Sequence, residues 1–304
     1  MSPQRSQPTI LLFGKNGQVG WELQRSLAPL GHVIAVDFES TEHYGDFANP
    51  SGIADTVRAL RPDIIVNAAA HTAVDKAEGE PELALLLNAT TPGVLATEAA
   101  RLGALLVHYS TDYVFDGSGS QPWIEGDAPA PLSVYGRTKW EGEQLIQQSG
   151  ARHLILRTSW VYAARGGNFA KTMLRLAQER ERLTVIEDQW GAPTGADLLA
   201  DVTAHAIRHL AERPQDSGLY HCVAAGETNW HRYAQEVLAL AAQLQPTLRF
   251  KATEVAPVPT SAFPTPAQRP HNSRLNTAHL RQTFGLTLPD WQHGVRRMLA
   301  ETLP

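Results

Sequence analysis

Cysteine is nearly absent from this sequence, which has one cysteine in 304 residues. No disulfide can therefore form within one chain. Such usage is typical of a reducing compartment, so we expect a cytoplasmic protein. The single cysteine, Cys222, lies in the apolar stretch 219–223. We expect a buried structural thiol there rather than a nucleophile.

Long hydrophobic runs are also missing. Residues 1–8 are polar, and the apolar run that follows covers only residues 10–13. A membrane-spanning helix needs about 20 apolar residues, and a signal peptide needs an apolar core of about 7–15. We therefore expect neither a membrane span nor a signal peptide.

An excess of positive charge is missing as well. Twenty-six Lys and Arg residues face 31 Asp and Glu residues, which leaves a formal net charge of −5. Nucleic-acid binding relies on a basic surface, so no nucleic-acid partner is expected. With 43% hydrophobic and 19% charged residues, the composition is that of a globular protein. The length indicates one large domain or two coupled domains.

The first half of the chain alternates short apolar runs with longer amphipathic stretches. Strands are predicted at 9–13, 32–36, 63–66, 105–109 and 153–156, and helices at 19–29, 51–60, 80–102 and 134–148. This alternation is typical of right-handed βαβ crossovers and a parallel sheet covered on both faces. The predicted fold class is α/β, a Rossmann-type doubly wound parallel sheet.

The pattern loosens after residue 158. Helices are predicted at 168–181, 197–211, 229–243 and 291–302, and strands at 183–187, 218–223 and 247–254. The stretch 257–270 contains five prolines and is predicted to be an extended loop. We expect a sheet domain at 8–160, to which the C-terminal half can return, and a smaller α+β lobe at 161–304.

Three glycines follow the first predicted strand. Gly14, Gly17 and Gly20 have the spacing GxxGxxG and open a helix, where glycine permits a tight turn and close approach to a pyrophosphate. The helix N-terminus would add free N–H groups. This placement favours dinucleotide binding over a plain strand–helix turn.

Two further positions fit the adenosine end of a dinucleotide. Asp37 ends the second predicted strand, about 17 residues after Gly20, close to the spacing of a ribose-binding acid. An ordinary turn aspartate is the alternative. Asp46 and Phe47 could flank the adenine, although a surface turn explains them nearly as well.

Tyr135 and Lys139 are four residues apart in a predicted helix, so their side chains lie on one face. A nearby ammonium stabilises a phenolate and brings the pKa of the phenol toward working pH, which makes Tyr135 a usable general acid. Thr111, at the end of the fourth strand, adds a hydroxyl at the edge where α/β sheets bind ligands.

These elements together resemble the extended, nucleotide-sugar branch of the short-chain dehydrogenase/reductase superfamily, and more narrowly the dTDP-4-dehydrorhamnose reductase family. The match includes STDYVFDG at 110–117 and extends over residues 12–20, 67–78, 135–139, 157–162, 188–194 and 269–275. It covers nearly the whole chain. Asn16 and His71 replace the more frequent Thr and Tyr, and neither removes a group that the chemistry needs.

The resemblance implies a role for each matching residue. The coenzyme, NADH or NADPH, would contact the glycine turn and several later positions, namely Gly14, Gly17, Gln18, Val19, Gly20, Asp37, Asp46, Phe47, Ala70, His71 and Thr72. Tyr135 would be the proton donor, and Lys139 would bind the nicotinamide ribose. Thr111 would tune the tyrosine. Thr111 and Asp112 would also touch the sugar, and Trp160 would pack on the sugar nucleotide.

The implied reaction is reduction of the C4 ketone of a dTDP-6-deoxy-4-hexulose to dTDP-L-rhamnose. The 8–160 domain would bind the dinucleotide and the 161–304 lobe mainly the dTDP-sugar. An epimerase or dehydratase on the same scaffold is one alternative, but a dehydratase would need a second carboxylate where Tyr113 stands. A non-catalytic nucleotide-binding regulatory subunit is the other, and it would not need both Tyr135 and Lys139.

The remaining candidates concern anions and metals. Arg269 and Arg274 flank the proline-rich stretch and could fork onto a diphosphate, with surface ion pairing as the alternative. Asp201, His205 and His209 lie on one predicted helix face, yet we assign no metal ligands. The family resemblance allows a homodimer with a divalent cation such as Mg²⁺ at its interface, for which no ligands can be mapped.

Overall fold

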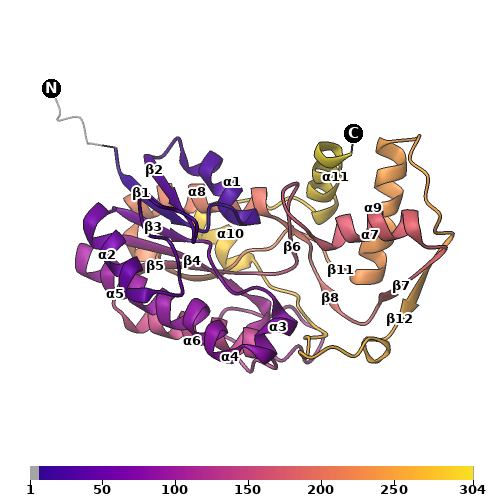
Figure 1. Cartoon of the computed structure of the whole chain (residues 1–304), viewed down its shortest axis with the longest axis horizontal. Helices are drawn as coiled ribbons and strands as arrows, with labels where there is room; N and C mark the ends of the chain where they lie inside the picture. The colour runs from indigo at the N-terminus through magenta and orange to yellow at the C-terminus, as the bar shows by residue number, and fades with distance from the viewer. Residues whose placement is uncertain (1–6, 304) are drawn as a thin grey trace.

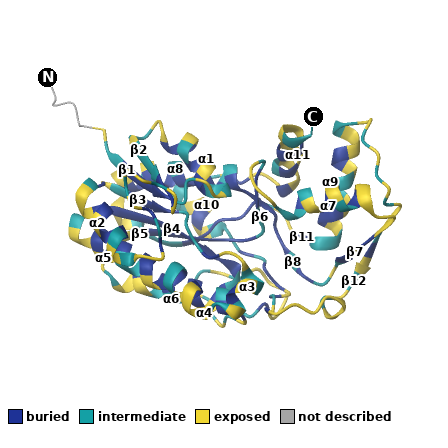
Figure 2. Ribbon diagram, in the orientation of Figure 1, coloured by how far each residue is buried: buried dark blue, intermediate teal, exposed yellow. Residues whose placement is uncertain are grey.

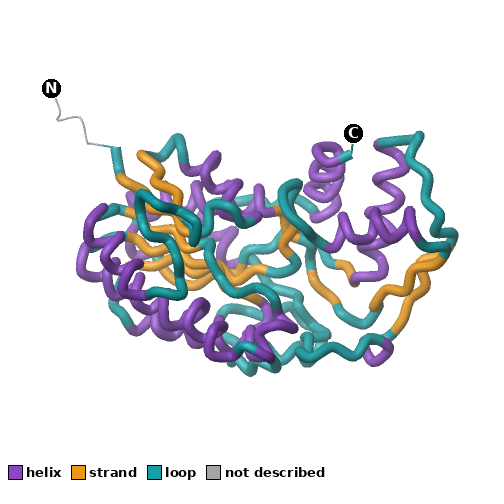
Figure 3. Tube along the Cα trace, in the orientation of Figure 1, coloured by secondary structure: helices purple, strands orange, loops and turns teal. Residues whose placement is uncertain are grey.

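The computed structural model describes residues 7–303 and divides into a larger sheet-containing part and a smaller lobe beside it (Figure 1). The larger part has a central sheet with helices on both sides. The lobe is a group of helices and short strands drawn from the second half of the chain (Figure 3). Buried residues concentrate in the central strands and in the segments that join the two parts (Figure 2).

The central sheet has six strands in the order β10-β5-β4-β3-β1-β2, and every pairing in it is parallel. The strands are β1 (Thr9–Phe13), β2 (His32–Val36), β3 (Ile64–Asn67), β4 (Leu105–Thr111), β5 (Arg152–Thr158) and β10 (Gly218–His221). The prediction of a Rossmann-type doubly wound sheet is confirmed. Strand β10 returns from the second half of the chain and pairs with β5.

Helices cover both faces because successive strand residues point to opposite sides. One face packs Ile10 and Leu12 against α1 (Gln18–Leu27), α8 (Ala196–Glu212) and α10 (Ala278–Phe284). The other face packs Leu11 and Phe13 against helices from the first half. These are α2 (Pro50–Leu60), α5 (Thr91–Leu102) and α6 (Val134–Gln148).

The helix predicted over 80–102 is confirmed as an unbroken helical run from Pro81 to Leu102, but the prediction missed a short helix before the run and a π-helical turn within it. The structure has α3 (Val74–Gly79), α4 (Pro81–Leu85), a π-helical turn (Leu86–Thr90) and then α5. Pro92 has no N–H to bond the Asn88 carbonyl, so the regular ladder cannot run through this point. A Cβ on Gly142 of α6 would lie 2.2 Å from that carbonyl oxygen, so α6 packs closely there.

The smaller lobe is built on three two-stranded sheets and three helices. The pairs are β6 (Val161–Tyr162) with β9 (Thr194–Gly195), β7 (Arg182–Ile186) with β12 (Glu254–Val258), and β8 (Trp190–Gly191) with β11 (Thr228–Asn229). The helices are α7 (Phe169–Glu179), α9 (Trp230–Leu244) and α11 (Trp291–Thr302). Across residues 7–303, no helix has the length and apolar character needed to cross a bilayer.

The position of the strand predicted at 247–254 is wrong, because β12 starts only at Glu254 and runs into the proline-rich stretch. Its register pairs Val255 with Leu183 and Pro257 with Val185. Strand β12 has only one partner, so Pro257 costs no ladder hydrogen bond on its open side. The rest of 257–270 is loop with one 3₁₀ turn (Thr260–Ala262).

Candidate active site

The glycine turn joins β1 to α1 and needs two of its three glycines for local reasons. Gly14 has φ +84°, and a Cβ there would lie 2.8 Å from the backbone of Ala68 and Ala69. A Cβ on Gly20 would lie 2.0 Å from the Gly14 carbonyl oxygen. Gly17 caps α1 without a side chain, so the first-turn N–H groups of α1 have no side-chain cap. This is the arrangement that binds phosphate at a helix N-terminus.

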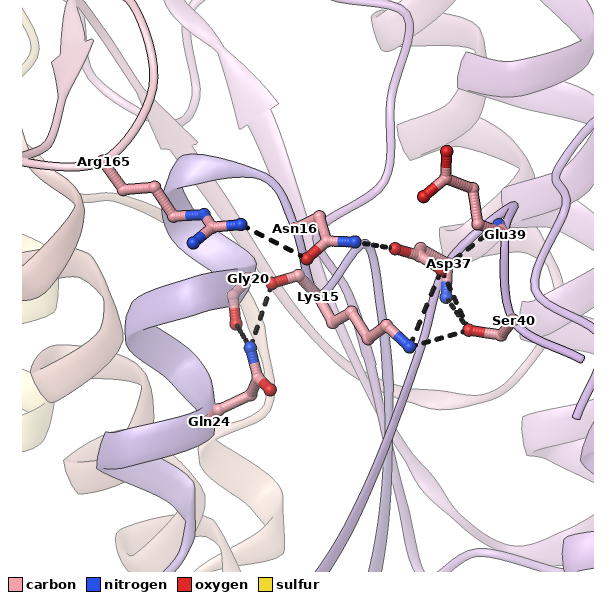
Figure 4. Close-up of polar contacts among 8 residues, drawn as sticks. All are labelled: Lys15, Asn16, Gly20, Gln24, Asp37, Glu39, Ser40 and Arg165. Atoms are coloured by element: carbon pink, nitrogen blue, oxygen red, sulfur yellow. Dashed lines mark hydrogen bonds and ion pairs between the residues drawn. The ribbon is translucent and has the colours of Figure 1, made fainter. Parts of the chain in front are cut away.

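Asp37 directly follows β2 and is buried, at 5% exposure. Its carboxylate accepts hydrogen bonds from the Ser40 hydroxyl at 2.9 Å, from the Glu39 N–H at 3.2 Å and from the Asn16 amide. Lys15 Nζ lies 3.7 Å from the carboxylate and donates to Ser40 Oγ at 3.0 Å (Figure 4). The end of β2 and the glycine turn are therefore tied together by polar contacts.

Arg165 reaches this network from the other part of the molecule, and sequence reasoning missed it. It lies in the loop after β6, with its guanidinium over the Trp21 ring at 4.0 Å. The guanidinium also lies 3.5 Å from the Asn16 carboxamide oxygen (Figure 4). Lys171 on α7 holds the loop by donating to the carbonyls of Ala164 and Gly166. An arginine beside two glycines after the fifth strand was the available signal.

The other predicted coenzyme positions lie around the ends of β3 and the loop after β2. Phe47 is buried in the core, edge-on to Phe13 with ring centroids 5.4 Å apart, and Asp46 accepts from the Ala48 N–H at 2.9 Å. Phe47 is thus a core residue whatever else it contacts. Ala70 is half-buried, and Thr72 is exposed.

His71 is buried and fixed by the π-helical turn. Its N–H donates to the Asn88 carboxamide oxygen at 2.8 Å, and its carbonyl accepts from the same carboxamide at 3.1 Å. Its Nε2 lies 3.4 Å from Glu80, and its Nδ1 is a buried atom without a hydrogen-bond partner in the described residues. The unusual π turn therefore shapes the chain beside the sheet edge.

Thr111 and Tyr135 lie together at the carboxyl end of β4. Thr111 Oγ1 donates to Asp112 Oδ1 at 3.0 Å and accepts from the Tyr113 N–H at 3.1 Å. Burial raises the pKa of Tyr135 to about 12, and a hydrogen bond with Thr111 partly offsets that rise. From the sequence, we expected a neighbouring ammonium to lower the pKa of this phenol. In the structure burial dominates, so the phenol keeps its proton.

Lys139 does not bond Tyr135 in this structure. Its Nζ donates to the Tyr109 carbonyl at 2.6 Å and lies 3.0 Å from His108 Nε2. Burial lowers the pKa of Lys139 to about 8. The helical spacing places both side chains correctly, but the amine is directed into the β4 strand.

Asp112 is buried beside the tyrosine, at 2% exposure. Burial raises its pKa to about 6, and hydrogen bonds with Ser273 and Thr111 oppose the rise. Its Oδ2 has no hydrogen-bond partner in the described residues. Ser273 belongs to the C-terminal half, so both halves of the chain meet at this carboxyl group.

Trp160 follows β5 in a strained conformation, with φ +49°. A bulky side chain with positive φ is uncommon and often marks a functional position. Its ring stacks on Trp230 with centroids 3.7 Å apart, and a Cβ on Gly191 would lie 2.9 Å from it. Packing from the smaller lobe therefore holds Trp160 at the sheet edge.

Both candidate diphosphate-binding arginines have carboxylate partners. Arg269 pairs with Asp75 at 2.7 Å, and Arg274 pairs with Glu227 at 2.6 Å. The Arg274 guanidinium also lies 4.8 Å from the Trp190 ring centroid. Ion pairing thus holds for both, and Arg274 is the one that lies among the tryptophans near Trp160.

Asp201, His205 and His209, the residues with a spacing that could hold a metal, all lie on α8. His209 Nε2 lies 2.7 Å from Asp216, and Asp201 pairs with Arg25 at 3.0 Å, so these side chains are engaged separately. Within residues 7–303 no three His, Cys, Asp or Glu side chains come together as a metal-binding group.

Gly14, Asp37, Ala70, Thr111 and Trp160 lie at or shortly after the carboxyl ends of β1, β2, β3, β4 and β5, which meet at one edge of a parallel sheet. The fold brings Tyr135, which is partly buried, together with the buried side chains of Thr111 and Asp112, and Lys139 lies on the same helix as Tyr135. The glycine turn and Asp37 form a second cluster with Lys15. A hydride-transfer site of this type needs a dinucleotide cradle and a proton donor at one sheet edge.

Comparison with known proteins points the same way. The family model for the RmlD substrate binding domain matches residues 8–303. A curated dTDP-4-dehydrorhamnose reductase from Escherichia coli (strain K12) is 63% identical over 292 residues, which is 96% of this chain and 97% of that protein.

Solved structures agree. The dTDP-4-dehydrorhamnose reductase of Bacillus anthracis str. Ames in complex with NADP has a TM-score of 0.86 and 34% identity, covering 97% of this chain and 100% of that one. The UDP-glucose 4-epimerase of Thermus thermophilus in complex with NAD has a TM-score of 0.78 at 21% identity, covering 97% and 98%. The second likeness is one of fold alone.

Proposed function

The chain belongs to the dTDP-4-dehydrorhamnose reductase family, and on that premise we propose how its residues carry out the reaction. It is a reductase that uses a nicotinamide coenzyme. The substrate is the 4-ketone dTDP-4-dehydro-β-L-rhamnose and the product is dTDP-L-rhamnose. The observation that carries the proposal is the pairing of Tyr135 with Thr111 at the sheet edge that also holds the glycine turn.

The chain fits a dinucleotide at this edge. The uncapped first turn of α1 offers N–H groups to a pyrophosphate, and Gly14 leaves free the space that a Cβ would fill against Ala68. Asp37 lies where it can accept from ribose hydroxyls, and Ala70, His71 and Thr72 line the path toward the nicotinamide. Arg165 closes over the turn from the smaller lobe.

The reduced coenzyme, when bound, supplies hydride to C4 of the sugar. Tyr135 then donates its phenolic proton to the developing alkoxide at O4, so the ketone gains one hydride and one proton. The high pKa of Tyr135 keeps that proton available at neutral pH. Thr111, whose hydroxyl donates to Asp112 in the free protein, turns this hydrogen to the oxygen where negative charge develops, and solvent returns the proton to Tyr135 after product release.

The sugar nucleotide is assigned mainly to the 161–304 half and the dinucleotide to the 8–160 half, with β10 and α8 returning to the sheet. Trp160 packs on the sugar nucleotide, Asp112 contacts the sugar, and Arg274 lies near enough to Trp190 to approach the diphosphate. Its pairing with Glu227 means that it must exchange partners to do so.

Both coenzymes are proposed to work, with NADH modestly favoured. The Asp37 carboxylate suits ribose hydroxyls, whereas it repels a 2′-phosphate, and Lys15 and Asn16 offset part of that repulsion. We place the reaction in the cytoplasm, in keeping with a single buried cysteine. A homodimer is part of the proposal, without a mapped interface. Mg²⁺ is left out of it, since residues 7–303 of one chain hold no group of three or more His, Cys, Asp or Glu side chains that could bind a metal ion.

One assay tests the proposal. The protein is mixed with NADH or NADPH and a panel of 4-keto nucleotide-sugars, and the nicotinamide absorbance is followed. We expect it to fall with the dTDP-linked 4-ketone and dTDP-L-rhamnose to appear in equal amount. Reaction of a UDP-sugar without loss of absorbance would indicate an epimerase instead. Binding of coenzyme without turnover on any sugar would indicate a regulatory subunit.

A further inference from the structure

Three buried side chains form a line of polar contacts beneath the sheet edge. Lys139 on α6, His108 on β4 and Asn67 on β3 are each 1–2% exposed. Lys139 Nζ lies 3.0 Å from His108 Nε2, and His108 Nδ1 lies 3.0 Å from Asn67 Nδ2. Because each contact needs one donor and one acceptor, the hydrogens on this line can be counted.

The backbone fixes the first member of the line. The Ala69 N–H donates to Asn67 Oδ1 at 3.0 Å, and a backbone N–H can only donate. The carboxamide of Asn67 therefore turns its oxygen to Ala69 and its NH₂ to His108. An amide NH₂ can only donate, so His108 Nδ1 must accept and carries no hydrogen.

The proton of the neutral imidazole is then on Nε2. Burial holds the pKa of His108 well below its usual value, so the ring is neutral. Its Nε2–H points at Lys139 Nζ, which has to accept. An ammonium has three donors and no acceptor, whereas a neutral amine has one lone pair. Lys139 can still donate to the Tyr109 carbonyl at 2.6 Å in that form.

We propose that Asn67 and His108, in the orientation that the structure shows, admit Lys139 only as an uncharged amine, and that each proton taken up by Lys139 requires the Asn67 carboxamide to turn over, which lowers the proton affinity of the lysine. His108 and Asn67 are thus positioning residues that act through Lys139. In the turned state Asn67 Oδ1 accepts from His108 Nδ1–H, Nε2 accepts from the ammonium, and the Ala69 N–H loses its acceptor. The inference concerns the free protein, so it stands whichever sugar the enzyme reduces.

The other charged groups near Lys139 are accounted for. On its own helix, Tyr135 keeps its proton, and Glu143 accepts from two nitrogens of Arg157 on β5, Nε at 2.9 Å and Nη2 at 2.6 Å. Glu143 raises the pKa of Lys139, but burial lowers it further. On the β4 side, the charge of Asp112 is engaged with Thr111. None of these groups offers the amine a hydrogen-bond acceptor in place of His108.

Rotation of the Asn67 carboxamide also affects the backbone at Ala69, next to the proposed coenzyme site. Ala69 adjoins Ala70, which we have placed along the nicotinamide side, and its N–H is held only while Asn67 faces it. A bound anionic dinucleotide favours the ammonium form of a nearby lysine. Coenzyme binding and proton uptake by Lys139 are therefore coupled through the rotation of one carboxamide.

The test is a direct titration of Lys139 in the full-length, coenzyme-free protein. The chain has only five lysines, at positions 15, 76, 139, 171 and 251, so lysine labelled with ¹³C at Cε gives five NMR signals. A Lys139→Met spectrum assigns the signal. We expect Lys139 to titrate at least about one pH unit below the other four, which is a tenfold lower proton affinity.

Two variants change the hydrogen count without removing the amine. In Asn67→Asp, one carboxylate oxygen accepts from Ala69 and the other from His108 Nδ1–H, so the ammonium is allowed. In His108→Gln, the new amide can present its oxygen to the ammonium without adding charge. Both are expected to raise the Lys139 midpoint by about one unit, tenfold in proton affinity. His221→Gln, at another buried histidine, should leave it unchanged.

The measured midpoints of Lys139 in the wild-type protein and in the two variants decide whether the proposal holds. A Lys139 that titrates with the other four lysines in the wild-type protein overturns the inference. A shift in Asn67→Asp with none in a folded His108→Gln also overturns it, because added charge alone would then explain the result. The other four lysine signals report whether each variant is folded. If His108→Gln fails to fold, an unchanged midpoint in Asn67→Asp is enough for rejection.

Discussion

The two ends of the proposed coenzyme site are built from different kinds of contact. At the reaction end, Thr111, Asp112 and Lys139 are each 2–4% exposed, and the pKa of each ionisable group there is shifted by burial. At the adenosine end, Asp37 is also buried, but its charged neighbours are not: the Lys15 side chain is 31% exposed, and Arg165 is a surface residue.

Burial and exposure give the two ends different kinds of specificity. In a buried cluster the position of one hydrogen decides which groups can bond, because an unpaired buried polar group is costly. At an exposed network, salt screens the charges and partners exchange at little cost. Variants at the reaction end should therefore change kcat, and variants at the adenosine end should change coenzyme affinity and its salt dependence.

The largest effect is expected from Tyr135→Phe. Loss of the phenolic proton should lower kcat by roughly 10²–10⁴, while the coenzyme Kd changes little because the ring remains. Steady-state kinetics and coenzyme titration measure the two quantities. Tyr44→Phe, at an exposed tyrosine, is the matched control. A variant that keeps more than half of wild-type kcat would show that Tyr135 is not the donor.

Thr111→Val should lower kcat by about tenfold or more with coenzyme affinity nearly constant. The hydroxyl acts where charge develops on the reacting oxygen, and valine cannot donate. Thr111→Ser retains the hydroxyl and should restore most of the rate. An unchanged kcat with a weaker coenzyme Kd would instead show that Thr111 contributes to coenzyme binding and not to the chemical step.

Trp160→Ala tests the boundary between the two ends. We expect affinity for the sugar nucleotide to fall about tenfold because a stacked aromatic surface is lost. Coenzyme affinity should stay near the wild-type value. Calorimetric titration with each ligand separates the two. Equal weakening of both ligands would mean that Trp160 supports the fold through Trp230 rather than contacting substrate.

Asp37→Ser should shift the ratio of kcat/KM toward NADPH by about fivefold. A unit charge pair ~5 Å apart costs about 3 kcal/mol at an effective dielectric of 20, and screening reduces this to about 1 kcal/mol. Asp55→Ser, an exposed acid on α2, makes the same charge change elsewhere. An unmoved ratio would assign Asp37 to the turn alone, where it already bonds Ser40.

The smallest effect is expected from Arg165→Gln, a two- to threefold weaker coenzyme Kd at low salt that disappears at high salt. Its kcat should not change. Arg175→Gln on α7, where Arg175 pairs with Glu179 on the surface, is the control for charge. A salt-independent loss would contradict the screened, exchangeable character of the adenosine end.

Local patterns were enough to predict the frame of the molecule. Alternation of apolar runs predicted the strands, and the glycine spacing predicted a turn in which Gly14 takes a positive φ. The spacing of Tyr135 and Lys139 correctly placed both on α6, because four residues make one helical turn.

What sequence reasoning missed depends on partners far away in the chain. His108 is one of seven buried residues of β4, and nothing local shows that its ring meets Lys139 and Asn67. Arg165 matters through Trp21, more than 100 residues earlier. The π turn (Leu86–Thr90) arises from Pro92, and the apolar periodicity of the residues around Pro92 is otherwise that of a regular helix. Burial was also underestimated, which is why the expected shift in the pKa of Tyr135 had the wrong sign.

The late return of β10 sets an order of events during synthesis on the ribosome. A nascent chain that has emerged through residue 160 holds five of the six sheet strands, yet β5 has no partner on its outer edge. The face that α8 will cover, against Ile10, Leu12 and Leu156, is then still open to solvent. An unpaired edge and a bare apolar face invite association with other chains. The first half therefore gains its last sheet partner and its cover from α8 only after the chain has been made through residue 221.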